Sequence, residues 1–236
     1  MSDGDAAVSL VLFSGLALRE ALEDELLPEF RARTGVAVEC RFDPTSVLVE
    51  QIHSGNVPDI LIGVTTAVDK LVDEGLFAEE SVTTIASSAV GIAVPIGTVV
   101  PKFESSAQFV DYLLAARSVA YSRSGASGIF FAGLLDRMGL TERINARATI
   151  LEKGFTAEAL LDGRADVAIQ QMSELLAIRG VQVIDAFPAD LQELTHFSAA
   201  RALESKRLEG ADRLLAFLTT QRSGEAFRET GLLVDD

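Results

Sequence analysis

Hydroxyl and glycine residues gather in four short segments, 14–16, 43–46, 122–128 and 170–173. Each follows a run typical of a β-strand and precedes a run typical of a helix. A helix N-terminus presents unpaired N–H groups and a partial positive charge, so several such ends can hold an anion with little formal charge. The residues that we expect to line this anion site are Ser14, Gly15, Leu16, Thr45, Arg123, Ser124, Gly125, Ala126, Ser127, Gln170 and Gln171.

The same residue types also cap helices that bind no ligand, because a serine or threonine oxygen can accept from the first free N–H groups. Each segment taken alone is explained by capping, whereas four of them together favour a binding site. Among the cations near these segments, we favour Arg123 over Arg19 as the partner of a ligand carboxylate. Arg19 lies in the first turn of an expected helix, where a surface role accounts for it.

The stretch from Gly125 to Ile129 lacks the final glycine of the G-x-S-x-G elbow, which disfavours a hydrolase. A triad of Ser127, His196 and an aspartate would need distant contacts. We therefore assign no catalytic residue from these motifs.

Other classes of chemistry are disfavoured by composition. With two histidines and one cysteine, none at ligand spacing, we expect no metal site. Neither the phosphate-binding lysine motif nor G-x-G-x-x-G follows any expected strand, so we expect no cofactor. A net charge of −15 with scattered basic residues disfavours nucleic acid and anionic membranes as partners. The lone Cys40 forms no intramolecular disulfide and is expected to be a structural thiol in a strand.

Strand-like and helix-like runs alternate along all 236 residues, which favours an α/β fold with parallel sheets and crossover helices. The length suits one large domain or two lobes. No flexible linker is present, so two lobes would share a hinge of strand crossings. The expected strands are 8–13, 36–42, 60–64, 90–94, 119–121, 166–170, 181–184 and 195–199. The expected helices are 17–34, 46–54, 68–74, 106–116, 128–138, 155–161, 173–178, 211–219 and 224–229.

The segments 12–15, 27–35, 50–55, 58–60, 71–75 and 163–169 together resemble the molybdate-type substrate-binding proteins of ABC transporters, which have the type II periplasmic-binding fold. The resemblance implies two Rossmann-like lobes joined by a two-strand hinge, with lobe 1 from residues 1–84 and 194–236 and lobe 2 from 85–193. It further implies a monomer that closes on a small anion between its lobes and serves an ABC transporter membrane subunit.

Three departures from this family bear on the ligand. Oxyanion binders of the family usually carry a serine where this chain has Ala17, a serine-rich loop where it has 43–46, and a tyrosine where it has Gln170 and Gln171. The expected ligand is therefore a di- or tricarboxylate or an oxyanion other than molybdate. The divergent subgroup with these features also resembles aconitate isomerase, so an isomerase that moves a proton on a tricarboxylate is the alternative. For that alternative, His196 and Glu174 are the candidate bases. A regulatory or orphan binding role is a third.

No apolar run reaches the roughly 18 to 20 residues of a membrane-spanning helix, so we expect no membrane insertion. The acidic N-terminus is not typical of a signal peptide. The sequence as written predicts a cytoplasmic protein, or a periplasmic one if a native signal has been removed.

Overall fold

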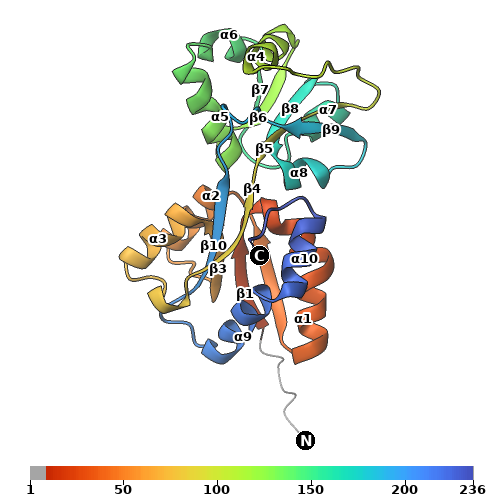
Figure 1. Cartoon of the computed structure of the whole chain (residues 1–236). Coiled ribbons are helices and arrows are strands. Elements are labelled where there is room, and N and C mark those ends of the chain that lie inside the picture. The colour runs from red at the N-terminus through yellow and green to blue at the C-terminus, as the bar shows by residue number, and fades with distance from the viewer. Residues whose placement is uncertain (1–8, 236) are drawn as a thin grey trace, which may run out of the picture. The chain divides into compact units, whose positions relative to one another are not determined.

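The computed structural model describes residues 9–235, and the chain forms two units, each built around its own five-stranded sheet (Figure 1). Of the described residues, unit 1 comprises 9–86, 196–229 and 233–235, and unit 2 comprises Ser87–Thr195 and Thr230–Leu232. The expected architecture of two α/β lobes is confirmed. Residues 230–232 belong to unit 2, so the chain crosses between the units once more near its C-terminus, which the sequence analysis did not predict.

The sheet of unit 1 has the strand order β2-β1-β3-β10-β4. Strand β1 (Ser9–Ser14) pairs in parallel with β2 (Ala37–Phe42) and β3 (Ile60–Val64). Strand β10 (Thr195–Arg201) runs antiparallel to β3. Because parallel strands end at the same edge of a sheet, the loops that follow β1, β2 and β3 are neighbours.

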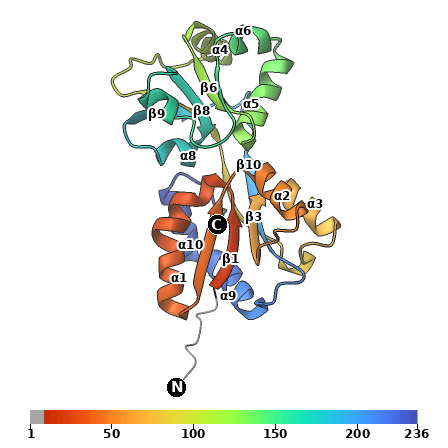
Figure 2. The ribbon, with the colours of Figure 1, turned by 180° about the vertical axis from the view of Figure 1, so that it is seen from behind.

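Helices cover both faces of this sheet (Figures 1 and 2). Helices α2 (Thr45–His53) and α3 (Thr65–Asp73) pack on the face that carries Phe13. The opposite face is covered by α1 (Leu27–Thr34), α9 (Leu208–Leu218) and α10 (Gln221–Glu229). The alternation of side chains along β1 explains this division, since successive residues of a strand point to opposite faces.

The helix expected at 17–34 is a continuous helical stretch that contains three types of helix. A 3₁₀ turn (η1, Leu16–Leu18) and a π-helix (η2, Ala21–Leu26) precede α1. Pro28 in the first turn of α1 has no N–H to donate, so it interrupts the regular hydrogen-bond ladder at this point. The stretch ends at Gly35 with φ = 74°, a left-handed conformation that favours glycine.

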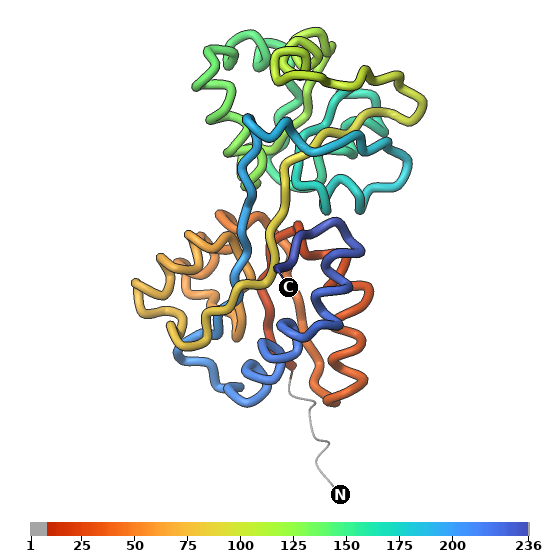
Figure 3. The backbone as a smooth tube through the Cα atoms, viewed as in Figure 1, coloured from red at the N-terminus to blue at the C-terminus, as the bar shows by residue number. Residues whose placement is uncertain are grey.

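Besides the crossing at residues 230–232, the chain passes between the units in two neighbouring strands, β10 and β4 (Thr83–Ser88), and Figure 3 follows its course. These strands form the expected two-strand hinge. Strand β4, with the sequence TTIASS, lies outside the expected strands. Because most of its residues are polar, it lacks the alternation of apolar and polar residues from which a strand is predicted. The short helix η3 (Glu79–Ser81), which precedes it, was also not expected.

The sheet of unit 2 has the order β7-β6-β8-β5-β9. Strand β6 (Val119–Ser122) is parallel to β7 (Thr149–Leu151) and β8 (Val167–Gln171). Parallel strands were expected, and the sheet is mixed, because β5 (Val90–Pro95) runs antiparallel to β8 and to β9 (Val181–Ala186). Periodicity reports which face a residue occupies and carries no information on strand direction.

Two layers of helices enclose this second sheet. Helices α4 (Ser106–Ala115), α5 (Ala126–Arg137) and α6 (Thr141–Asn145) cover the face with Val119 and Tyr121. Helices α7 (Glu158–Leu161) and α8 (Met172–Leu176) cover the face with Ala120. Strand β7 and helix α6 were not expected, since three and five residues are too short for a periodic pattern.

Candidate functional site

In unit 1, three helices begin directly beyond the ends of neighbouring strands. Ser14 ends β1, while Thr45 begins α2 and Thr65 begins α3. Ser14 is fully buried, and the one side-chain hydrogen bond found for it among residues 9–235 is a long 3.2 Å donation to the Gly15 oxygen. These helix starts therefore place hydroxyl groups and free N–H groups at one sheet edge.

Thr45 connects the three strand ends. Its Oγ1 accepts a hydrogen bond from the Val64 N–H at 3.2 Å, at the end of β3. A Cβ atom added to Gly15 would lie 3.8 Å from the same oxygen and 3.7 Å from the Phe197 ring. The Thr45 hydroxyl thus lies close to the Gly15 backbone, as the predicted site requires of these two residues.

Thr65 and Ser198 belong to the same cluster and were missed by the sequence analysis. Their hydroxyl oxygens are 2.8 Å apart. Thr65 could have been found, because it follows the expected strand 60–64 as Ser14 follows the first strand. Ser198 left no such signal, since antiparallel pairing of β10 with β3 brings it from 133 residues away.

In unit 2, the segment 122–128 joins β6 to α5. The Ser122 hydroxyl accepts from the Gly125 N–H at 3.1 Å. A Cβ atom would lie 2.4 Å from the Ser122 hydroxyl if added to Gly125, and 1.8 Å from the Ser122 backbone oxygen if added to Gly128. Close packing against β6 therefore requires a glycine at residue 128, where the overlap is with the backbone. Ala126 and Ser127 form the first turn of α5, and Ser127 is 1% exposed.

Arg123 and Ser124 are held by the loop after β7. Arg123 Nε lies 3.1 Å from a carboxylate oxygen of Glu152, and both side chains are exposed. The Ser124 hydroxyl donates to the backbone oxygen of Glu152. Because an acidic partner already pairs with Arg123, its role as a cation for the ligand stays a prediction.

Gln170 is buried, and its amide is fully used within unit 2. Its Oε1 accepts from the Thr156 N–H at 2.7 Å and from the Thr156 hydroxyl at 3.0 Å. Its Nε2 donates to the Gly154 oxygen at 2.9 Å. Gln170 therefore ties the end of β8 to the loop after β7, a supporting role that the sequence analysis did not foresee.

Gln171 faces the end of β4 and the start of β10. Its amide nitrogen donates to the Ala89 backbone oxygen and to Ser88 Oγ, each at 3.3 Å. Its amide oxygen accepts from Thr195 Oγ1 at 2.7 Å. This orientation pairs a donor with acceptors and an acceptor with a hydroxyl. Gln171 thus links the end of β4 to the start of β10, where these two strands enter unit 2.

Glu174 lies in the first turn of α8 and is 8% exposed. Its carboxylate accepts from the Gln171 N–H at 3.3 Å. Burial raises its pKa to about 7, while hydrogen bonds from the Gln171 backbone and the Gln170 side chain act in the opposite direction. The other candidate base, His196, is exposed and belongs to unit 1. The structure therefore groups Glu174 with Gln170 and Gln171.

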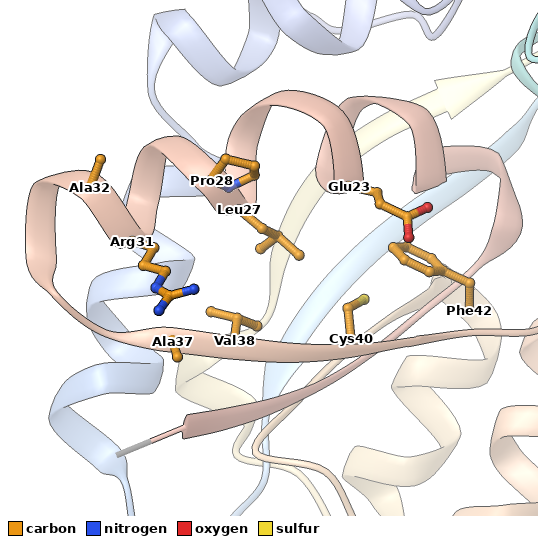
Figure 4. Close-up of a pocket in the computed structure, with 9 residues that line it drawn as sticks. All are labelled: Glu23, Leu27, Pro28, Arg31, Ala32, Ala37, Val38, Cys40 and Phe42. Carbon is orange, nitrogen blue, oxygen red and sulfur yellow. The ribbon is translucent and has the colours of Figure 1, made fainter. Parts of the chain in front are cut away.

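An open groove in unit 1 lies apart from the predicted site residues (Figure 4). It runs between β2 and the helical stretch that contains Glu23 and Arg31, and Cys40 forms part of its wall. Burial is the main cause that raises the pKa of the Cys40 thiol, and the Glu23 charge adds to it against the opposing charge of Arg19. The thiol therefore stays protonated near neutral pH, as a structural cysteine does.

Within residues 9–235, no helix is both long and apolar enough to cross a membrane. The same residues form no group of three or more histidine, cysteine, aspartate or glutamate side chains suited to a metal ion.

Residues 10–233 match the family described as bacterial extracellular solute-binding protein. The chain belongs to this family. This solute-binding protein is 29% identical over 214 residues to aconitate isomerase from a Pseudomonas species, with 88% of this chain and 81% of the relative covered. It is 22% identical over 230 residues to the molybdate-binding protein ModA of Escherichia coli, covering 95% and 89% of the two chains.

Among solved structures, the periplasmic molybdate-binding protein of Azotobacter vinelandii superposes with a TM-score of 0.80 and 17% identity, covering 96% of this chain and 100% of that one. At this identity the likeness concerns the fold. The resemblance drawn from segments such as 27–35 and 163–169 is confirmed, and so is the expectation of a solute-binding protein.

Proposed function

We propose that this solute-binding protein binds a small anion, an oxyanion or a di- or tricarboxylate, through the strand-to-helix loops of its two units. The observation that carries the proposal is the cluster in unit 1, where the Thr45 hydroxyl lies beside Gly15 and beyond the neighbouring ends of β1 and β3. Helix starts and hydroxyls at one sheet edge suit an anion.

In unit 1, neutral donors do the binding in this proposal, because the nearby cations have other partners. Arg19 pairs with Glu23 at 2.7 Å and lies over the Phe42 ring. Arg41 lies over the Phe13 ring. The overall charge of −15 opposes an anion only weakly at the site, since salt screens charges beyond about 8 to 10 Å.

Calorimetry and thermal unfolding with sulfate, molybdate, cis-aconitate and trans-aconitate test the proposal. An anion at about 100 times its dissociation constant should stabilise the protein by roughly 2.7 kcal/mol. We expect Thr45→Val and Ser127→Ala each to weaken binding about tenfold, from the loss of one donor to a charged group. Thr219→Val, at the exposed C-terminal end of α9, is the matched control.

No stabilisation by any of these anions would refute the proposed ligand class. Binding that is unaffected by both Thr45→Val and Ser127→Ala would refute the assignment of the site.

A second candidate function is the isomerisation of a tricarboxylate by proton transfer. It is supported by the 29% identity to aconitate isomerase and by the buried Glu174, whose pKa of about 7 suits a general base. Ultraviolet absorbance would follow the conversion of either aconitate isomer, and Glu174→Gln should abolish it. A flat trace with both isomers rejects this candidate.

We further propose that the protein acts outside the cytoplasm as a monomer that serves an ABC transporter membrane subunit. The family's description as extracellular supports the location. Fractionation of the native host and light scattering of the purified protein test location and oligomeric state.

A further inference from the structure

Glu174 is a buried carboxyl that anion binding as proposed does not use. It sits in the first turn of α8, directly after β8, with its carboxylate 3.3 Å from the Gln171 N–H. The adjacent Ser173 hydroxyl is buried and has no hydrogen-bond partner within residues 9–235. Strand β8 lies next to β6 in the sheet, so Glu174 lies close to the edge at which α5 begins.

Hydrogen bonds, together with the backbone of β8 and of the loop after β7, connect Glu174 to the segment 122–128. Glu174 accepts from the N–H of Gln171, which directly follows Gln170 in β8, and the Gln170 side chain binds Thr156 and Gly154 in the loop after β7. The same loop contains Glu152, whose backbone oxygen accepts from the Ser124 hydroxyl. A change in the charge of Glu174 therefore acts on groups that hold the proposed anion loop in place.

The elements around Glu174 supply no buried cation. Strands β5 and β8 and residues 230–232 contain no titratable side chain, and β9 contains only Asp185, which is exposed. The loop after β7 contributes Glu152 and Lys153, both exposed. No charged group is among the causes of the raised pKa, which desolvation dominates. The charged and neutral forms of Glu174 therefore coexist near neutral pH.

We propose that anion binding in unit 2 is coupled to partial protonation of the Glu174 carboxylate. This inference rests on the proposed function. An anion near a buried carboxylate favours the neutral acid, because like charges in a poorly solvated site repel each other. By linkage, the affinity for the anion then falls as the pH rises through neutrality, and a bound-state pKa that is about one unit higher corresponds to a tenfold loss.

Calorimetric titration with sulfate, molybdate and fumarate at about pH 6 and about pH 9 tests this coupling. These probes stay fully ionised over that range, so a pH dependence belongs to the protein. We expect about five- to tenfold weaker binding at the higher pH. Near pH 7.5, titrations in two buffers with different ionisation enthalpies should show the uptake of a fraction of a proton, approaching about one half for a one-unit rise in pKa.

Glu174→Gln keeps the size of the side chain and an oxygen that can accept from the Gln171 N–H. It should bind with the same affinity at both pH values and take up no proton. Glu158→Gln removes an exposed carboxylate from α7 of the same unit and should retain the wild-type pH dependence.

Equal affinities at both pH values without proton uptake would overturn the inference and leave the proposed function standing. This measurement on the wild-type protein needs no variant, so misfolding of a variant does not affect it. A full pH dependence in Glu174→Gln would overturn the assignment to Glu174. Failure of every anion to bind at either pH would overturn the proposed function and this inference with it.

Discussion

A Cβ atom at Gly128 would lie 1.8 Å from the backbone oxygen of Ser122. No rotamer change can relieve this overlap, because both atoms belong to rigid parts of the structure. The start of α5 therefore approaches the end of β6 as closely as it does only because residue 128 has no side chain. This approach sets the position of Ser127, one of the proposed anion ligands.

We expect Gly128→Ala to destabilise unit 2 by about 2–4 kcal/mol, because the helix must move away from the strand. Binding of any anion that the wild type binds should also be lost. Gly133→Ala, in the same helix, is the control. Its Cβ would have only an ordinary 3.6 Å contact with Arg137, and the change should stabilise by about 0.5–1 kcal/mol. Denaturant unfolding of both variants measures the difference, and equal effects would contradict this account.

The pair formed by Thr65 and Ser198 should contribute to both stability and binding. Their hydroxyls are 2.8 Å apart at the edge where α3 begins. A double-mutant cycle with Thr65→Val, Ser198→Ala and the double variant should give a coupling of about 1 kcal/mol in unfolding. If the pair also contacts the anion, Thr65→Val weakens binding, and an unchanged dissociation constant would exclude it from the site.

Much of the fold was predictable because helix ends and buried strands leave local signals. The helices expected at 17–34 and 68–74 are followed directly by Gly35 and Gly75, whose φ values are 74° and 72°. Strand 60–64 was placed without error, since its five residues are apolar or glycine between polar neighbours. These features depend on residues that are adjacent in sequence.

Pairing direction and long-range contacts were not predictable. Nothing in the residues of β5 or β9 indicates that they run antiparallel to their neighbours. The four expected site segments lie at the strand ends of two different sheets, two segments in each unit. The alternation of strands and helices along the sequence does not show to which sheet a strand belongs. The hydrogen bond from the Thr156 N–H to the Gln170 amide oxygen depends on the conformation of the loop after β7, which no local sequence pattern predicts.

Asp59 should be a determinant of the stability of unit 1. It is buried before β3, accepts from the Val11 N–H and from the Ser205 hydroxyl at 2.8 Å each, and pairs with Arg207 at 3.3 Å. Asp59→Ala leaves a strand N–H without its acceptor and should cost about 3 kcal/mol. Asp69→Ala, on the exposed side of α3, should change the free energy of unfolding by less than about 0.5 kcal/mol. Urea unfolding followed by circular dichroism compares the two.

Glu174 should make the stability of the ligand-free protein depend on pH. Its pKa is about 7 in the folded protein, against an ordinary value of 4.5. Below pH 4.5 both the folded and the unfolded chain carry the proton, and the contribution of the neutral acid is complete. Between pH 4.5 and about 7 the unfolded chain releases the proton first, so folding becomes less favourable as the pH rises. Above pH 7 both states are ionised and the loss is complete.

The expected loss is about 3 kcal/mol, because each pKa unit corresponds to about 1.4 kcal/mol. Glu174→Gln cannot titrate and should lack this part of the pH dependence, while all other ionisable groups contribute equally to both proteins. The measurement is the difference in unfolding free energy between wild type and variant at several pH values from about 4.5 to 8. It should change in favour of the variant as the pH rises. Parallel curves would show that the buried carboxyl does not titrate in this range.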